Sequence, residues 1–270
     1  MLEPLLIVYL VVLGLCTGFL AGLLGIGGGM IMVPFLTAIL TARGVSPDLA
    51  VKVAIATSMS TIVFTSISSL RAHHKRRAVR WDIVRGLAPG IVLGAAVASM
   101  GVFAILKGAW LALFFALFVS FSASQMLLDK KPKPSRGLPG TSGLLGAGSF
   151  IGFLSGLVGA GGGFASVPFM TWCNVVIHQA VATSAALGLP IALANTVGYV
   201  LAGQGVDGLP AGSVGYVFAP ALIVIAAASV LMAPLGVKAA HALPVKSLKR
   251  VFASVLYMLA AYMVWKAISI

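Results

Sequence analysis

Long apolar stretches with almost no charged residues make up most of this sequence. Of its 270 residues, 60% are hydrophobic and only 9% are charged, which is far from the composition of a soluble domain. A helix needs about 20 apolar residues to cross a bilayer whose hydrocarbon core is about 30 Å thick. We therefore expect an all-α integral membrane protein, because a helix satisfies its own backbone hydrogen bonds in lipid. Short polar breaks separate the apolar stretches, which lie at 4–24, 30–42, 53–70, 86–104, 109–128, 141–158, 164–177, 180–202, 214–236 and 251–268.

Two of these stretches, 30–42 and 164–177, are shorter than the others. Neither is long enough to cross the hydrocarbon core comfortably. We expect half-helices here, and the sequence leaves open whether they span the membrane or re-enter it.

Acidic residues are rare and lie only at the ends of the apolar stretches. Carboxylate pairs for acid–base catalysis and carboxylate metal sites within the membrane are therefore not expected. The two cysteines, Cys16 and Cys173, lie in apolar stretches and indicate neither a disulfide nor a zinc site. The sequence thus predicts no enzyme and no bound metal or cofactor. The five acidic residues are Glu3, Asp48, Asp82, Asp129 and Asp207.

Positive charge is concentrated in a few loops. Fourteen of the 18 basic residues lie in loops 71–85, 129–140 and 237–250, whereas loop 203–213 has Asp207 and no Lys or Arg. In membrane proteins, cytoplasmic loops are the ones rich in Lys and Arg. The net charge of +13 therefore indicates cytoplasmic basic loops rather than a nucleic-acid partner, and loop 203–213 is expected outside.

The chain also contains an internal duplication. Residues 14–37 match residues 148–171 at a constant offset of 134, with 14 of 24 positions identical. A second match, at an offset of 126, relates 54–58 to 180–184. The first apolar stretch has no Lys or Arg before it and runs directly into the duplicated motif, so we expect a retained helix rather than a cleaved signal.

The two copies are expected to be inverted relative to each other. The first-half equivalent of the outward loop 203–213 is the basic loop 71–85, so equivalent loops lie on opposite sides, and both termini are expected outside. Many secondary transporters consist of such inverted repeats, with the substrate site near the midplane where the repeats meet. The predicted division is a first membrane repeat over 1–128, a cytoplasmic linker over 129–140 with a stiff Lys-Pro-Lys-Pro sequence, and a second membrane repeat over 141–270, each repeat with about five hydrophobic segments and a Gly-broken helix.

Gly-rich breaks follow the first helix of each repeat. Four glycines in five residues occur at 25–29 and again at 159–163. Bare backbone is costly in hydrocarbon unless it is buried in protein or lines a cavity. A short helix follows each break, so that its N–H groups and positive end point into the break, which is an arrangement that binds anions. The alternative is a tight turn that needs glycine only for its backbone angles. The candidate anion-binding glycines are Gly27, Gly28, Gly29, Gly161, Gly162 and Gly163.

Hydroxyl pairs occur near the start of the next long apolar stretch of each repeat, at Thr57-Ser58 and Thr183-Ser184. Their hydroxyl groups can donate hydrogen bonds to an oxygen-rich anion. The alternative is that each hydroxyl bonds back to a carbonyl one turn earlier in its own helix. We include all four residues among the candidate substrate-binding residues.

Three further polar residues are candidates for the same site. Lys52 and His178 stand five residues before the two threonines, and each is either an anion partner or an interfacial cation. Asn195 occupies the place that Ser69 has in the first repeat. An amide within the membrane is either a ligand donor or a hydrogen-bonding group between helices.

The duplicated motif G-F-L-x-G-L-x-G-x-G-G-G-x-x-x-V-P-F, together with the sequence from His178 to Ala185, resembles the TauE/SafE sulfite exporter family, also called the toluene sulfonate uptake permease family. The resemblance covers essentially the whole chain. It implies a multi-pass permease of the bacterial inner membrane for small anions, often sulfur-containing, such as sulfite, thiosulfate, sulfoacetate or other sulfonates. The Gly-rich breaks and the Thr-Ser pairs are recurring positions of the family. The family often has histidine five residues before the threonine in both halves, whereas the first copy here has Lys52.

The function expected from these features is secondary transport of a small anion by alternating access, with a lipid bilayer around the protein and no nucleic-acid partner. A passive anion channel or a scaffold subunit shares the same features. An intramembrane hydrolase using Ser155 or Ser166 with a histidine is a further alternative. The anion, the direction of transport, the coupling ion and the oligomeric state are left open.

The charge distribution predicts a membrane topology that labelling can test. In a background without Cys16 and Cys173, a cysteine in loop 71–85 should react only from the cytoplasmic side, and a cysteine at position 207 should react only from outside, because basic loops stay inside. Accessibility to a membrane-impermeant maleimide is the measurement. Labelling of position 207 from the cytoplasmic side alone would contradict the inverted arrangement.

Overall fold

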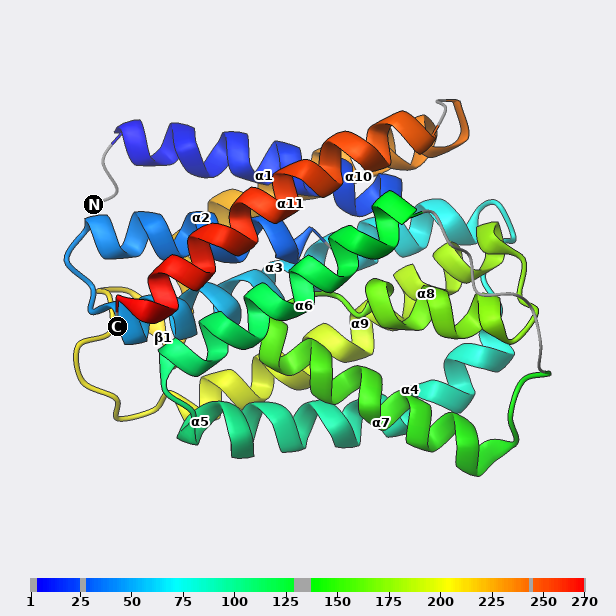
Figure 1. Cartoon of the computed structure of the whole chain (residues 1–270), viewed down its shortest axis with the longest axis horizontal. Coiled ribbons are helices and arrows are strands. Elements are labelled where there is room, and N and C mark those ends of the chain that lie inside the picture. The colour runs from blue at the N-terminus through cyan, green and yellow to red at the C-terminus, as the bar shows by residue number, and fades with distance from the viewer. Residues whose placement is uncertain (1–3, 25–27, 129–136, 243–244, 270) are drawn as a thin grey trace.

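The computed structural model describes residues 4–24, 28–128, 137–242 and 245–269. Within these ranges it does not describe the side chains of residues 24, 240–242 and 245–251. Within these ranges the chain is almost entirely helical (Figure 1). The elements are α1 (Pro4–Leu24), α2 (Gly29–Ala42), α3 (Pro47–His74), α4 (Trp81–Ala96), the π-helical η1 (Val97–Val102), α5 (Phe103–Ile105), α6 (Gly108–Leu128), α7 (Thr141–Val158), α8 (Gly163–Trp172), α9 (Ile177–Ala202), β1 (Ser213–Val214), β2 (Val217–Phe218), α10 (Ala219–Ala242) and α11 (Val245–Ile268).

The helices have the length and composition of membrane spans. In the described ranges, 7 helices are long and apolar enough to cross a bilayer. Large apolar side chains, among them Leu5, Phe150 and Leu231, are exposed on the outer surface, where a soluble protein would keep such patches small. The expected all-α integral membrane fold is confirmed.

The helices α2 and α8 are short, as the sequence predicts. They have 14 and 10 residues, which corresponds to about 21 and 15 Å of helix. Each begins after a left-handed glycine, Gly28 with φ 68° and Gly162 with φ 74°, a conformation that only glycine adopts readily. Each short helix therefore begins next to a backbone conformation that favours glycine.

Two expected boundaries are wrong. The segment 237–250 is not a loop, because α10 continues to Ala242 and α11 begins at Val245. Alanines favour the continuation of α10, because alanine has the highest helix propensity. The stretch expected to begin at 214 begins as a helix only at Ala219, because Ser213–Phe218 form the small antiparallel hairpin of β1 and β2.

The two halves of the chain pack on each other in crossed pairs. The first helix α1 packs along α10 of the second half, and α7 packs along α4 of the first half, while α3 packs on α9 and α6 on α11 (Figure 1). Glycines at every fourth position permit the contacts of α1 and α7. A Cβ atom added to Gly18 would lie 2.4 Å from the Ser229 carbonyl oxygen, and one added to Gly152 would lie 2.2 Å from that of Ile91.

Equivalent residues thus make equivalent contacts in the two halves. Along α1, Gly14, Gly18 and Gly22 meet successively later residues of α10, so these two helices run in parallel. The same holds for Gly148 and Gly152 of α7 along α4. The inverted orientation of the repeats in a bilayer stays a prediction, as does the cytoplasmic linker, whose residues 129–136 lie outside the described residues.

The close backbone contact at Gly152 predicts a large cost for any side chain there. Gly152→Leu should lower the free energy of unfolding by at least about 1–3 kcal/mol, the usual cost of overpacking. Gly146→Leu in the same helix is the matched control, because nothing lies within 4 Å of an added Cβ there. Unfolding in mixed detergent and SDS micelles measures both variants. Equal stability of the two variants would contradict the packing described for α7 and α4.

Candidate functional site

The break of the second repeat lies against the start of α2 from the first repeat. A Cβ atom added to Gly29 would lie 2.2 Å from the Gly159 carbonyl oxygen and 3.0 Å from the Ser58 Oγ. The two backbones therefore touch, and only glycine at position 29 permits this distance. Gly27 and the rest of 25–27 lie outside the described residues, so the structure places the first break only from Gly28 onward.

Serines from the two hydroxyl pairs contact this region. The Ser58 hydroxyl donates a hydrogen bond of 3.1 Å to the Gly159 carbonyl. In the second half, the hydroxyl of Ser166 in α8 donates to Ser184 Oγ at 2.8 Å. The Gly162 N–H donates to the Ala160 carbonyl at 2.8 Å. Much of the polar backbone and hydroxyl chemistry at the breaks is therefore satisfied within the protein.

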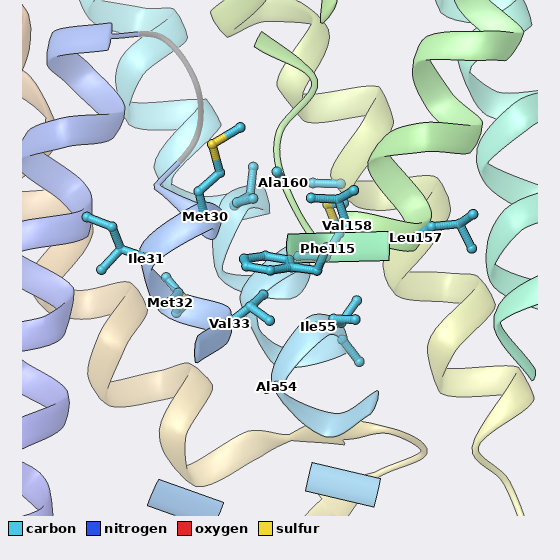
Figure 2. Packing of buried hydrophobic residues seen from close by; sticks show 14 of the residues in the cluster. Met30, Ile31, Met32, Val33, Ala54, Ile55, Phe115, Leu157, Val158 and Ala160 are labelled. Carbon is cyan, nitrogen blue, oxygen red and sulfur yellow. The ribbon is translucent and has the colours of Figure 1, made fainter. Parts of the chain in front are cut away.

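The surroundings of the breaks are apolar. Figure 2 shows Met30 and Val33 of α2, Ile55 of α3, Phe115 of α6 and Ala160 of the second break gathered around this centre, and all of them are buried. None of these side chains carries a charge. Any anion that enters here has to be bound by neutral donors and by the positive ends of α2 and α8.

A small cavity lies beside the second break, between α3 and α9. Its volume is about 20 Å³, which is room for about one water molecule. The site is therefore closed to a larger ligand in this conformation. The lining consists mostly of small and hydroxyl side chains: Ala21, Ile62, Thr65, Ser66, Ser69, Gly161, Ser184, Ala185 and Gly188.

One of the lining hydroxyl groups lacks a partner. Thr65 and Ser66 donate back to carbonyls of their own helix, whereas Ser69 Oγ is buried and has no hydrogen-bond partner among the described residues. An unpaired buried hydroxyl costs free energy, so a partner such as water or a ligand oxygen is expected. Of the candidates from the sequence, Gly161 and Ser184 line this cavity.

The two threonines make a contact that neither expectation included, while their binding of an anion stays a prediction. Thr57 Oγ1 accepts a hydrogen bond of 2.9 Å from the Phe218 N–H, and Thr183 Oγ1 accepts one of 3.0 Å from the Arg80 N–H. Phe218 directly precedes α10, and Arg80 directly precedes α4. Each threonine thus binds the backbone at the start of a helix in the other half. Its hydroxyl proton can still be donated to a second acceptor.

Lys52 and His178 lie in unlike environments, although their sequence positions are equivalent. The buried Lys52 Nζ donates to the Ala104 carbonyl at 3.3 Å and lies 5.7 Å from the centre of the Tyr216 ring. Burial and the charge of Asp48 raise the pKa of Tyr216, so its ring stays a neutral partner for this cation. His178 is exposed in the first turn of α9. Neither residue lines the cavity.

Asn195 does not line the cavity and lies beside Gly156, which precedes the second break. Its Nδ2 donates to the Ile191 carbonyl at 2.9 Å, and its Oδ1 is buried without a partner among the described residues. The Asn195 side chain packs against Gly156, whose carbonyl accepts a hydrogen bond from the Tyr199 hydroxyl. Ser69 and Asn195, which are equivalent in the repeat, therefore both present an unsatisfied polar atom.

Thr65 and Ser66 are lining residues that the sequence analysis did not select. For Thr65, a signal exists in the spacing. Hydroxyl residues recur at every fourth position of α3, at Thr57, Thr61, Thr65 and Ser69, and residues at this spacing share one face of a helix. A polar face on a buried membrane helix indicates a hydrated or ligand-binding surface.

Comparison with known proteins identifies the family. The family model described as Sulfite exporter TauE/SafE matches residues 10–263. The chain belongs to the TauE/SafE family. A probable membrane transporter protein of Haemophilus influenzae is 36% identical over 94% of this chain and 96% of its own length. One of Methanocaldococcus jannaschii is 28% identical, with 96% of both chains covered. No solved structure gave a significant match.

The family membership identifies this TauE/SafE protein as a multi-pass membrane transporter. The contacts of the two serines considered for a hydrolase bear on that alternative. Ser166 donates to Ser184 rather than to a histidine, and Ser155 Oγ has no hydrogen-bond partner among the described residues. A serine nucleophile needs an adjacent base, and neither contact supplies one.

The crossed threonine contacts predict a stability effect. Thr57→Val and Thr183→Val each leave a backbone N–H without its acceptor, and each should lower the free energy of unfolding by about 1–3 kcal/mol. Thr171→Val is the matched control, because its hydroxyl bonds only to carbonyls of its own helix and its loss should change stability by less than about 0.5 kcal/mol. Unfolding in mixed micelles is again the measurement, and a loss no larger than that of the control would show that the crossed contacts contribute nothing.

Proposed function

We propose that this TauE/SafE protein is a secondary transporter of a small oxyanion in a bacterial inner membrane, with sulfite or organosulfur anions such as sulfoacetate, other sulfonates or thiosulfate as the substrate class. The observation that carries the proposal is the hydroxyl-lined cavity beside the second Gly-rich break, where α2 of the first half touches the break of the second. The family description, which names a sulfite exporter, supports the sulfur-containing class.

The chemistry of the cavity suits an anion that accepts several hydrogen bonds at once. Ser69 has a donor to offer, and Ser184 lines the opposite wall of the cavity. Among the residues that the structure describes, no arginine or lysine lines the cavity, so the charge of the anion is balanced by neutral donors and by helix ends. Neutral hydrogen bonds are weaker than charge-assisted ones. Weak binding is useful in a carrier, because the substrate has to leave on the other side.

The size of the cavity supports alternating access. Space for about one water molecule is too small for a sulfite or sulfonate ion with its oxygens, so the halves have to move apart for binding. The cavity lies between α3 and α9, one helix from each half. Movement of one half against the other would open it first to one side and then to the other.

Uptake and binding by the purified protein test the proposal. Proteoliposomes are assayed with sulfite, thiosulfate, sulfoacetate, taurine and sulfate. Saturable uptake of at least one sulfur oxyanion, accelerated when the same anion is present on the opposite side, is the expected result for a carrier. Non-saturating flux without counterflow would indicate a channel, and no flux of any of the five would contradict the proposed substrate class.

Serine variants test whether the cavity is the binding site. Ser69→Ala and Ser184→Ala each remove one lining hydroxyl and should weaken binding of the best substrate by about 1–2 kcal/mol, which is roughly 5- to 30-fold. Ser60→Ala is the matched control, because this buried serine of α3 bonds only to the Ala56 carbonyl of its own helix. Calorimetric titration measures the three affinities. Binding by both cavity variants within about twofold of the control would place the substrate elsewhere.

A further inference from the structure

A groove separate from the central cavity runs between the C-terminal parts of α3 and α10. Its volume is about 700 Å³, which is within the range of about 300–1,000 Å³ typical of ligand pockets. Two of its lining residues join the helices, because the Ser68 hydroxyl donates to the Val230 carbonyl at 3.1 Å. None of its lining residues belongs to the central cavity.

The groove has an apolar part and a cationic part. Phe64, Ile67, Val230, Pro234 and Val237 form the apolar part. Towards the ends of the two helices the lining becomes basic. The cations are Arg71, Lys75 and Arg76 from the α3 side and Lys238 from α10, and all four are exposed.

Within the described ranges, no carboxylate lines the groove to neutralise these cations. Asp82, which lies near in sequence, forms a salt bridge of 2.6 Å with Arg80. Asp48 lies near the opposite end of α3, about 35 Å from Arg71 at 1.5 Å per residue. The groove therefore holds four positive charges beside an apolar surface, with no anion from the described part of the chain lining it.

We propose that this groove binds an anionic phospholipid, with the phosphate at Arg71, Lys75, Arg76 and Lys238 and an acyl chain along the apolar part. Basic pockets between membrane helices bind acidic headgroups in this way, and each cation near the headgroup contributes to binding. A free phosphate would use only the cations and would leave the apolar part in contact with other lipids. The combination of both surfaces favours the lipid as the occupant.

The position of the groove gives the lipid a structural role distinct from substrate binding. The walls come from α3 of the first half and α10 of the second. These two helices pack on each other. A lipid in the groove bridges the halves on the outer surface, while the central cavity lies on the other contact of α3, with α9. Lipid binding is thus expected to depend on Arg71 and Lys238 and not on the cavity serines.

Lipid titration of the detergent-solubilised full chain tests the proposal. Native mass spectrometry measures the dissociation constant of the first bound molecule of dihexanoyl phosphatidylglycerol and of dihexanoyl phosphatidylcholine. We expect the anionic lipid to bind at least tenfold more tightly. Equal binding of the two lipids would overturn the proposal, because it would leave only an apolar groove.

Matched double variants assign the site. Arg71→Gln/Lys238→Gln should weaken binding of phosphatidylglycerol by about 30-fold, since each cation contributes about fivefold. Arg77→Gln/Arg85→Gln removes the same charge from exposed residues of the same basic region that do not line the groove, and should weaken binding by less than about threefold. Equal losses in the two double variants would indicate general surface attraction and overturn the proposal.

Two further measurements separate the lipid from its headgroup and guard against misfolding. Ala72→Phe places a bulky ring in the groove lining without changing charge, and it should abolish tight lipid binding even if the double glutamine variant fails to fold. Glycerol 3-phosphate should not displace the lipid at concentrations a hundredfold above it. Displacement by this headgroup alone, or unchanged lipid binding by Ala72→Phe, would overturn the proposal in favour of a free-anion site.

Discussion

Backbone groups outside regular helix have to be satisfied in an interior that excludes water, and the rest of this structure is arranged around that requirement. The Gly159 carbonyl accepts a hydrogen bond from Ser58 of the other half, and the backbone of Gly29 packs directly against it. An unpaired carbonyl at such a depth would cost several kcal/mol. At this break the first half supplies a hydrogen-bond donor to the backbone of the second half, and the central cavity lies beside this contact.

Two further hydrogen bonds join the halves. Thr57 and Thr183 accept backbone N–H groups that directly precede α10 and α4. The glycines of α1 and α7 bring those helices into backbone contact with α10 and α4. In the described part of the chain, the main contact of α1 is with α10 of the other half, and the main contact of α7 is with α4 of the other half. Such crossed packing joins the two halves through contacts along several helices.

Two kinds of anion chemistry are kept apart in the molecule. The central cavity offers hydroxyl groups and helix ends without a charged side chain, which suits a substrate that is bound weakly and released. The groove between α3 and α10 offers four cations on an apolar surface, which suits a ligand that stays.

The apolar stretches, the two short helices and the Gly-rich breaks follow from the sequence, because hydropathy and glycine content act locally on the chain. Local rules fail at 237–250, an expected loop in which α10 continues to Ala242 and α11 begins at Val245. Several partners of polar groups are decided by the tertiary structure. Thr57 and Thr183 lie in helical sequence like the hydroxyl residues that bond back to their own helix. Their acceptor role nevertheless depends on residues 161 and 103 positions away in the chain.

Lys52 and His178 occupy equivalent positions in the two repeats, but Lys52 is buried against Ala104 and Tyr216 while His178 is exposed. Such contacts join distant parts of the chain, and only the packing of the two halves brings their atoms within hydrogen-bonding distance.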